Sequence, residues 1–139
     1  TYAKCDNISP DKFVKYCYEG FGRLLLQVGY RNPEQAIAYC YQGNQPAYHN
    51  DCLIGTLKSV LKRDANTGSE AAFKFCSLSN LDFKSQCYQI VGMWIKAFFY
   101  PNLQEREKEC SKATDSDYVT DCINASEETI VQASIFEPV

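Results

Sequence analysis

Apolar positions recur along this chain with a period of 35 residues, and within each period they fall on one face of an α-helix. A cysteine marks the repeat at a constant step, at Cys17, Cys52, Cys87 and Cys122. The positions 4 residues before and 1, 4 and 8 residues after this cysteine share one helical face. The pattern therefore predicts four long helices, each with its cysteine on the buried stripe. The aromatic and apolar residues of this stripe are Phe13, Tyr48, Phe83 and Tyr118 before the cysteine, and Tyr18, Leu53, Tyr88, Ile123, Leu25, Val60, Ile95 and Ile130 after it.

Proline and capping residues give the expected ends of these helices. The expected starts of the long helices are Pro10, Pro46, Leu81 and Ser116, and the expected ends are close to Gly29, Asp64, Tyr100 and Ser134. A turn and a short helix follow each of the first three. The short helices are expected to open at Asn32-Pro33, Ser69 and Leu103, and to end at Cys40, Cys76 and Cys110.

Small residues recur at two further positions of the repeat, at Gly20, Gly55 and Ala125 and at Gly22 and Gly92. Glycine inside a helix costs about 1 kcal/mol relative to alanine, so its repeated use indicates that helices approach closely there. The alternative interpretation of residues 20–22 as a phosphate-binding loop lacks a preceding strand and a Lys-Ser/Thr pair.

These patterns together predict an all-α protein, a short α-solenoid of four disulfide-linked helical hairpins. The repeat units are expected at residues 5–39, 40–75, 76–109 and 110–139, within one domain that covers 1–139. A chain of 139 residues is long enough to bury a core of its own.

Eight cysteines alternate between short and long separations, and no CxxC pair suited to zinc is present. Disulfides in an oxidising compartment are favoured over eight free thiols in a cytosolic protein. Hairpin geometry places each short-spaced pair on either side of a turn, whereas Cys17 and Cys40 would be offset by roughly 7 Å. The predicted disulfides are Cys5–Cys17, Cys40–Cys52, Cys76–Cys87 and Cys110–Cys122, each of which should stabilise the fold by about 3 kcal/mol.

The segments Cys17-Tyr-Glu-Gly-Phe-Gly-Arg and Cys52-Leu-Ile-Gly give the chain a resemblance to bacterial secreted cysteine-rich helical-repeat proteins. These are relatives of the tetratricopeptide class, in which the disulfide also joins consecutive helices of a hairpin. The resemblance extends over nearly the whole chain as architecture. It implies an extracytoplasmic role in protein interaction or as a scaffold, and it implies no catalytic residue.

Charge and hydropathy narrow the function classes further. The net charge of −3 gives no reason to expect nucleic-acid binding, and no apolar run reaches the ~18 residues of a membrane span. Residues 1–64 carry a net charge of +2 and residues 65–139 a net charge of −5. No metal or other cofactor is expected.

Polar residues offer weaker candidates for chemistry. His49 is expected to be a surface residue near a helix start. A paired-carboxylate site could be formed by Glu105, Glu107 and Glu109, but an alternating run of charges is more typical of a solvated helix face. The acids from Asp115 to Asp121 lack the glycine and the final glutamate of a calcium loop. Two glycosylation sequons begin at Asn7 and Asn124.

The segment 88–100 is apolar on nearly every face, unlike its three counterparts. Such a helix is either central in the core or has a partner on its second side. The second alternative makes Trp94, Phe98, Phe99 and Tyr100 candidate partner-binding residues. A third possibility is a carrier that holds an apolar small molecule between helices near Trp94.

The expected function is therefore non-catalytic binding, scaffolding or assembly by a secreted or periplasmic protein. The first repeat has no helix to cover Tyr2, Phe13 and Tyr16. This face is expected to pack against an upstream segment or against another subunit joined head to tail.

Overall fold

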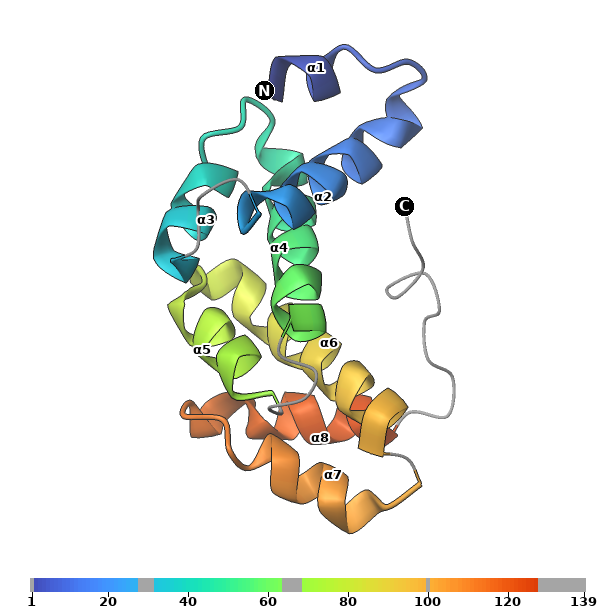
Figure 1. Ribbon diagram of the computed structural model, residues 1–139, viewed down its shortest axis with the longest axis vertical. Helices are drawn as coiled ribbons and strands as arrows, with labels where there is room; N and C mark the ends of the chain where they lie inside the picture. Colours follow the sequence, from blue (N-terminus) through green and yellow to red (C-terminus); the bar gives the residue numbers. More distant parts are fainter. Residues whose placement is uncertain (1, 28–31, 64–68, 100, 128–139) are drawn as a thin grey trace. The chain divides into compact units, whose positions relative to one another are not determined.

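The computed structural model shows an all-α chain, which confirms the predicted fold class (Figure 1). It describes residues 2–27, 32–63, 69–99 and 101–127, and the side chains of residues 2, 3 and 99 also lie outside the description. The described part contains α-helices and short 3₁₀ helices and no strand. The chain divides into two compact units, residues 1–59 and residues 60–138, with the boundary inside one helix. The single domain and the solenoid stay predictions.

The first unit begins with two helices joined by a disulfide. Its elements are α1 (Tyr2–Asp6), η1 (Asp11–Phe13), α2 (Val14–Leu25), α3 (Pro33–Cys40), η2 (Pro46–Tyr48) and the first part of α4 (His49–Arg63). The predicted starts hold, because 3₁₀ turns begin directly after Pro10 and at Pro46. The amide N–H of Gln27 donates to the carbonyl of Leu24 at 2.9 Å, a 3₁₀-type bond that ends α2 before the predicted position near Gly29.

The second unit is built around its longest helix. The elements are α5 (Glu70–Leu78), α6 (Leu81–Phe99), α7 (Leu103–Cys110), η3 (Ser116–Tyr118) and α8 (Val119–Glu127), and α6 packs against α5, α7 and α8. Asn102 caps α7 by accepting a hydrogen bond from the Glu105 amide at 3.2 Å. The predicted end near Ser134 and the core position Ile130 lie outside the described residues.

All eight cysteines form disulfides, and the four pairs are the predicted ones. Their Cα atoms lie 5.5–5.8 Å apart, which is the usual spacing. Each bond joins a short helix to the next long helix across the intervening turn. The loops that they close contain about a dozen residues, so each disulfide limits the freedom of the unfolded chain.

Equivalent positions of the two units make equivalent contacts, 70 residues apart. The fully buried Tyr18 ring lies 5.4 Å from Tyr48, and the fully buried Tyr88 ring lies 5.1 Å from Tyr118. A Cβ at Gly22 would be 1.9 Å from the carbonyl oxygen of Cys52, and a Cβ at Gly92 would be 2.2 Å from that of Cys122. Glycine is needed at both positions, because the helices pass too closely for a side chain.

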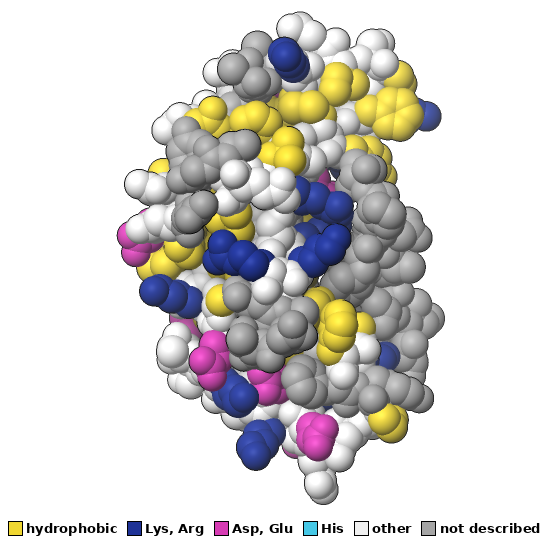
Figure 2. Space-filling view, viewed as in Figure 1, with side chains coloured by type: hydrophobic (Ala, Val, Ile, Leu, Met, Phe, Trp, Pro, Cys, Tyr) yellow, Lys and Arg dark blue, Asp and Glu magenta, His cyan; other side chains and the backbone are white. Residues whose placement is uncertain are grey.

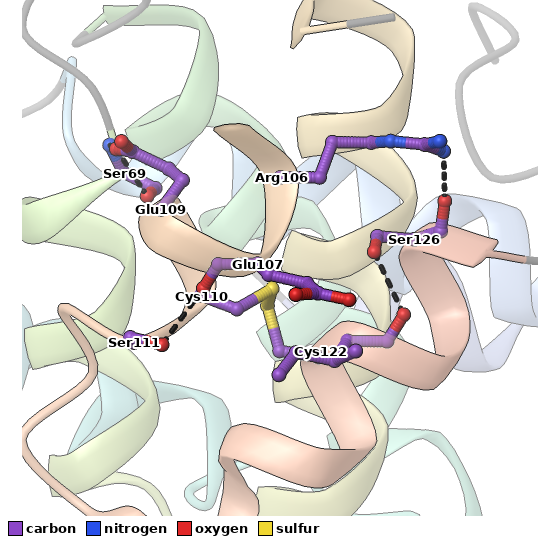
Figure 3. The surroundings of a disulfide bond; sticks show 9 residues. Ser69, Arg106, Glu107, Glu109, Cys110, Ser111, Cys122 and Ser126 are labelled. Atoms are coloured by element: carbon purple, nitrogen blue, oxygen red, sulfur yellow. Dashed lines mark hydrogen bonds between the residues drawn. A yellow bond between two sulfur atoms is a disulfide. The ribbon is translucent and has the colours of Figure 1, made fainter. Parts of the chain in front are cut away.

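The charged helix α7 buries two of its charges beside the disulfide Cys110–Cys122 (Figure 3). Glu109 accepts hydrogen bonds from the amide and hydroxyl of Ser69 at 3.2 and 3.0 Å, and Arg106 donates to the carbonyl of Ser126. Burial would raise the pKa of Glu109, but hydrogen bonds from Lys112 and Ser69 outweigh it and lower the pKa. The expectation of a fully solvated acidic face was therefore wrong at Glu109, because this carboxylate holds the start of α5.

Candidate interaction surface

Helix α2 buries one face and exposes another. Its inner face contains Val14, Tyr18, Gly22 and Leu25, which are all buried. Next to this face, the Glu19 carboxylate accepts hydrogen bonds from Arg23 at 3.2 Å and from Lys58 of α4. The inner face therefore joins α2 to α4 through apolar packing and paired charges, and it is fully used within the first unit.

The outer face of α2 has an apolar stripe of its own, called here the α2 outer stripe, which is formed by Tyr16, Gly20 and Leu24 together with Phe13, the last residue of η1. The spacings of 3, 4 and 4 residues place these positions along one side of the helix. Phe13, Tyr16 and Leu24 are 46%, 42% and 51% exposed. Figure 2 shows hydrophobic side chains gathered over α2 on the face in view. The outer stripe resembles a helix-packing surface that is open to solvent.

Gly20 lies in the middle of this stripe, and nothing is within 4 Å of the position that its Cβ would occupy. The recurring small residues predicted close helix approach, and this prediction is confirmed at Gly22, Gly55 and Gly92. At Gly20 the structure shows open space instead. A helical glycine with open space at its Cβ position costs stability, and no close helix contact compensates for that cost.

Two lysines accompany the exposed rings. The Lys12 ammonium lies 5.2 Å from the centre of the Phe13 ring, and the Lys15 ammonium lies 4.8 Å from that of Tyr16. Both distances suit cation–π contacts. Neither ring has an aromatic partner in the described part of the chain, in contrast to Tyr18 and Tyr88. The surface thus combines aromatic area with positive charge.

The predicted binding residues at the end of α6 are split between the core and the surface. Trp94 is only 4% exposed, and Phe98, whose ring centre lies 4.6 Å away, is 61% exposed. Trp94 therefore belongs to the core of the second unit, the first of the two alternatives. The Phe99 side chain and Tyr100 lie outside the described residues.

The sequence missed Leu24 and the open position of Gly20 as surface candidates. Alignment on the cysteines assigned Phe13 to the buried stripe, as the counterpart of the buried Phe83, and this assignment was wrong because Phe13 is exposed. The signal that could have found the outer stripe is the pair Tyr16 and Leu24, which lie eight residues apart on a side of the helix that the cysteine alignment leaves unassigned.

His49, at the start of α4, holds the preceding loop. Its Nε2 atom makes a 2.7 Å hydrogen bond with the carbonyl of Gly43, and its ring meets Tyr41 edge-on at 5.2 Å. The side chain is half-buried, so the expected surface histidine is partly wrong. The loop carbonyl and the Tyr41 ring account for the position of His49 without any catalytic role.

Asp51 lies on the part of α4 that faces α2. Burial raises its pKa to about 6; the positive charge of Lys15 lowers the pKa and the negative charge of Glu19 raises it. The side chain therefore changes charge near neutral pH.

The acids near the start of α8 are engaged separately. Asp115 accepts a hydrogen bond from the Asp117 amide at 3.3 Å, and Asp121 accepts one from Ser85 at 3.1 Å. Among the described residues no group of three or more His, Cys, Asp or Glu side chains is arranged to hold a metal ion.

A hollow of about 260 Å³ lies on the second unit. Its lining mixes one aromatic ring with charged and polar side chains: Glu70, Phe73, Lys74, Ser77, Lys112 and Thr114. Such a lining does not suit an apolar ligand, and Trp94 is not part of it.

Comparison with known proteins returned nothing: no family model, curated protein or solved structure matches this chain. None of the helices in the described ranges combines the length and the apolar character that a membrane span requires.

Proposed function

We propose that this chain is a non-catalytic, extracytoplasmic binding module that contacts a protein partner through the α2 outer stripe. The observation that carries the proposal is the exposure of Phe13, Tyr16 and Leu24 on a helix whose opposite face is already buried. Contiguous exposed apolar and aromatic side chains are typical of protein interaction sites.

The frame beneath the stripe supports this role. The disulfide Cys5–Cys17 holds the first turn of α2, and the close contact at Gly22 holds its last turn against α4. A helix fixed at both places presents its outer side chains with little loss of freedom on binding. Four disulfides also suit a secreted or periplasmic location.

The proposed function is non-catalytic because the side chains best suited to catalysis are already engaged in structural contacts. All eight cysteines are oxidised, so none offers a thiolate nucleophile. The ring of His49 is held by a loop carbonyl. The rival role as a carrier of an apolar small molecule receives no support from the buried, side-chain-packed environment of Trp94.

Site-specific photo-crosslinking tests the proposal. A benzophenone amino acid replaces Tyr16 in one sample and the exposed Lys74 of the second unit in the other. Both samples are irradiated with the extracytoplasmic fraction of the source cells. We expect a discrete adduct only from position 16, which excess unlabelled chain removes and Leu24→Glu abolishes. No adduct, or equal adducts from both positions, would contradict the proposed surface.

A further inference from the structure

The proposed binding function leaves the partner open, and the α2 outer stripe itself points to one. We infer that α2 pairs with α2 of a second copy of this chain, antiparallel and crossing at Gly20, to form a two-fold symmetric dimer. This inference rests on the proposed function and names its partner.

The first argument is the notch at Gly20. Within the first unit, α2 and α4 cross closely because each supplies a glycine: a Cβ at Gly22 would be 1.9 Å from the Cys52 oxygen, and one at Gly55 would be 1.9 Å from the Glu19 oxygen. Gly20 lies on the other side of the same helix, where nothing is within 4 Å of the position that its Cβ would occupy. Two copies that cross at Gly20 would repeat this two-glycine arrangement across a symmetry axis.

The second argument is the symmetry of the stripe about Gly20. Tyr16 and Leu24 lie four residues before and after it, so each is about 6 Å along the helix axis from the crossing point. In an antiparallel pair, Tyr16 of one copy therefore faces Leu24 of the other, twice. An isologous interface requires such self-complementarity.

The third argument is charge. Lys15 lies about 7.5 Å before the crossing point, and the last residue of α2, Leu25, lies about 7.5 Å after it. Antiparallel pairing puts the N-terminal half of each α2, which carries Lys15, alongside the negative C-terminal end of the other α2. It also separates the lysines of the two copies, so that their like charges do not oppose dimer formation.

The test is sedimentation of the full disulfide-bonded chain over about 5–500 µM, a range suited to a small interface. We expect the wild-type chain to shift from monomer to dimer. Gly20→Leu should remove the dimer and keep the fold, because the added side chain enters open space in the monomer. Leu24→Glu, a second variant at an exposed position, should also give a monomer. Phe98→Glu, at an exposed position of the second unit, should leave the dimer unchanged.

Mixing a tagged wild-type chain with Gly20→Leu distinguishes this dimer from a head-to-tail one. A symmetric crossing needs the glycine on both copies, so the mixture should form no heterodimer. A strictly monomeric wild-type chain, a dimer that survives Gly20→Leu, or heterodimers with that variant would each overturn the inference.

The two proposals fail separately in the crosslinking experiment. An adduct from position 16 at twice the chain mass of 15.8 kDa supports the dimer. An adduct of any other mass that is abolished by Leu24→Glu supports the binding function, but it overturns self-association as the role of the outer stripe. Absence of every adduct from position 16 contradicts both.

Discussion

The two glycines of α2 form a matched pair in which the same substitution should have opposite effects on stability. Gly20→Ala adds a methyl group in open space, and Gly22→Ala adds one 1.9 Å from the Cys52 carbonyl oxygen. The helix propensity gained is the same at both sites, about 0.5–1 kcal/mol. Only the space around the new carbon differs.

The cost at Gly22 follows from the backbone that it meets. The methyl carbon and the Cys52 oxygen must separate by about 1.1 Å to reach even 3.0 Å, and neither belongs to a flexible side chain. Forcing atoms into a packed interior typically costs 1–3 kcal/mol or more. We expect Gly22→Ala to destabilise the protein by about 2 kcal/mol and Gly20→Ala to stabilise it by about 0.5–1 kcal/mol.

Urea unfolding of the oxidised protein, followed by circular dichroism, measures both changes. Measurement at low protein concentration keeps any association from adding to the stability of the reference chain. Equal effects of the two substitutions, or a stabilising Gly22→Ala, would refute the close crossing of α2 and α4. A destabilising Gly20→Ala in the monomer would refute the open space at Gly20.

Three further matched comparisons follow from buried groups. Tyr18→Phe should lower the free energy of unfolding in urea by about 1 kcal/mol, because it removes the 2.6 Å hydrogen bond to Asp6. Tyr88→Phe should instead stabilise the protein, since the buried Tyr88 hydroxyl has no hydrogen-bond partner in the described structure. Burial raises the pKa of Asp51 from 3.8 to about 6, so the folded protein gains stability as the pH falls through 6 towards 4. Asp51→Asn should therefore stabilise the protein by about 1 kcal/mol at pH 8 and have no effect at pH 4. Unfolding measured at the two pH values checks this. Trp94→Ala should cost about 3–5 kcal/mol, but Phe98→Ala should change thermal stability little, and similar losses would show that Phe98 is also core.

Local signals explain why the helix limits and the disulfides could be predicted from the sequence. The start at Leu81 and the whole of α7 depend on a capping residue and on apolar spacing, which act within a few residues. The pairing of Cys40 with Cys52 depends only on the length of one turn. Such constraints need no knowledge of distant parts of the chain.

The environment of individual side chains could not be predicted in this way. Glu109 is one of several acids on a charged helix, and only contact with Ser69, 40 residues earlier, makes it a buried hydrogen-bond acceptor. Gly20 and Gly22 look alike in the sequence, and only the path of α4 separates their roles. These distinctions arise from packing between segments, which the residue pattern of one segment does not contain.

The position of the disulfides has a consequence for resistance to proteolysis. Exposed turns such as the one that contains Ser9 and the one that contains Asn44 are natural sites of cleavage. Both turns lie between the two cysteines of a disulfide, so a cut there opens the backbone but releases no fragment. A nicked chain would keep its helices tethered at their packing distance, and it could go on working in a medium that contains proteases.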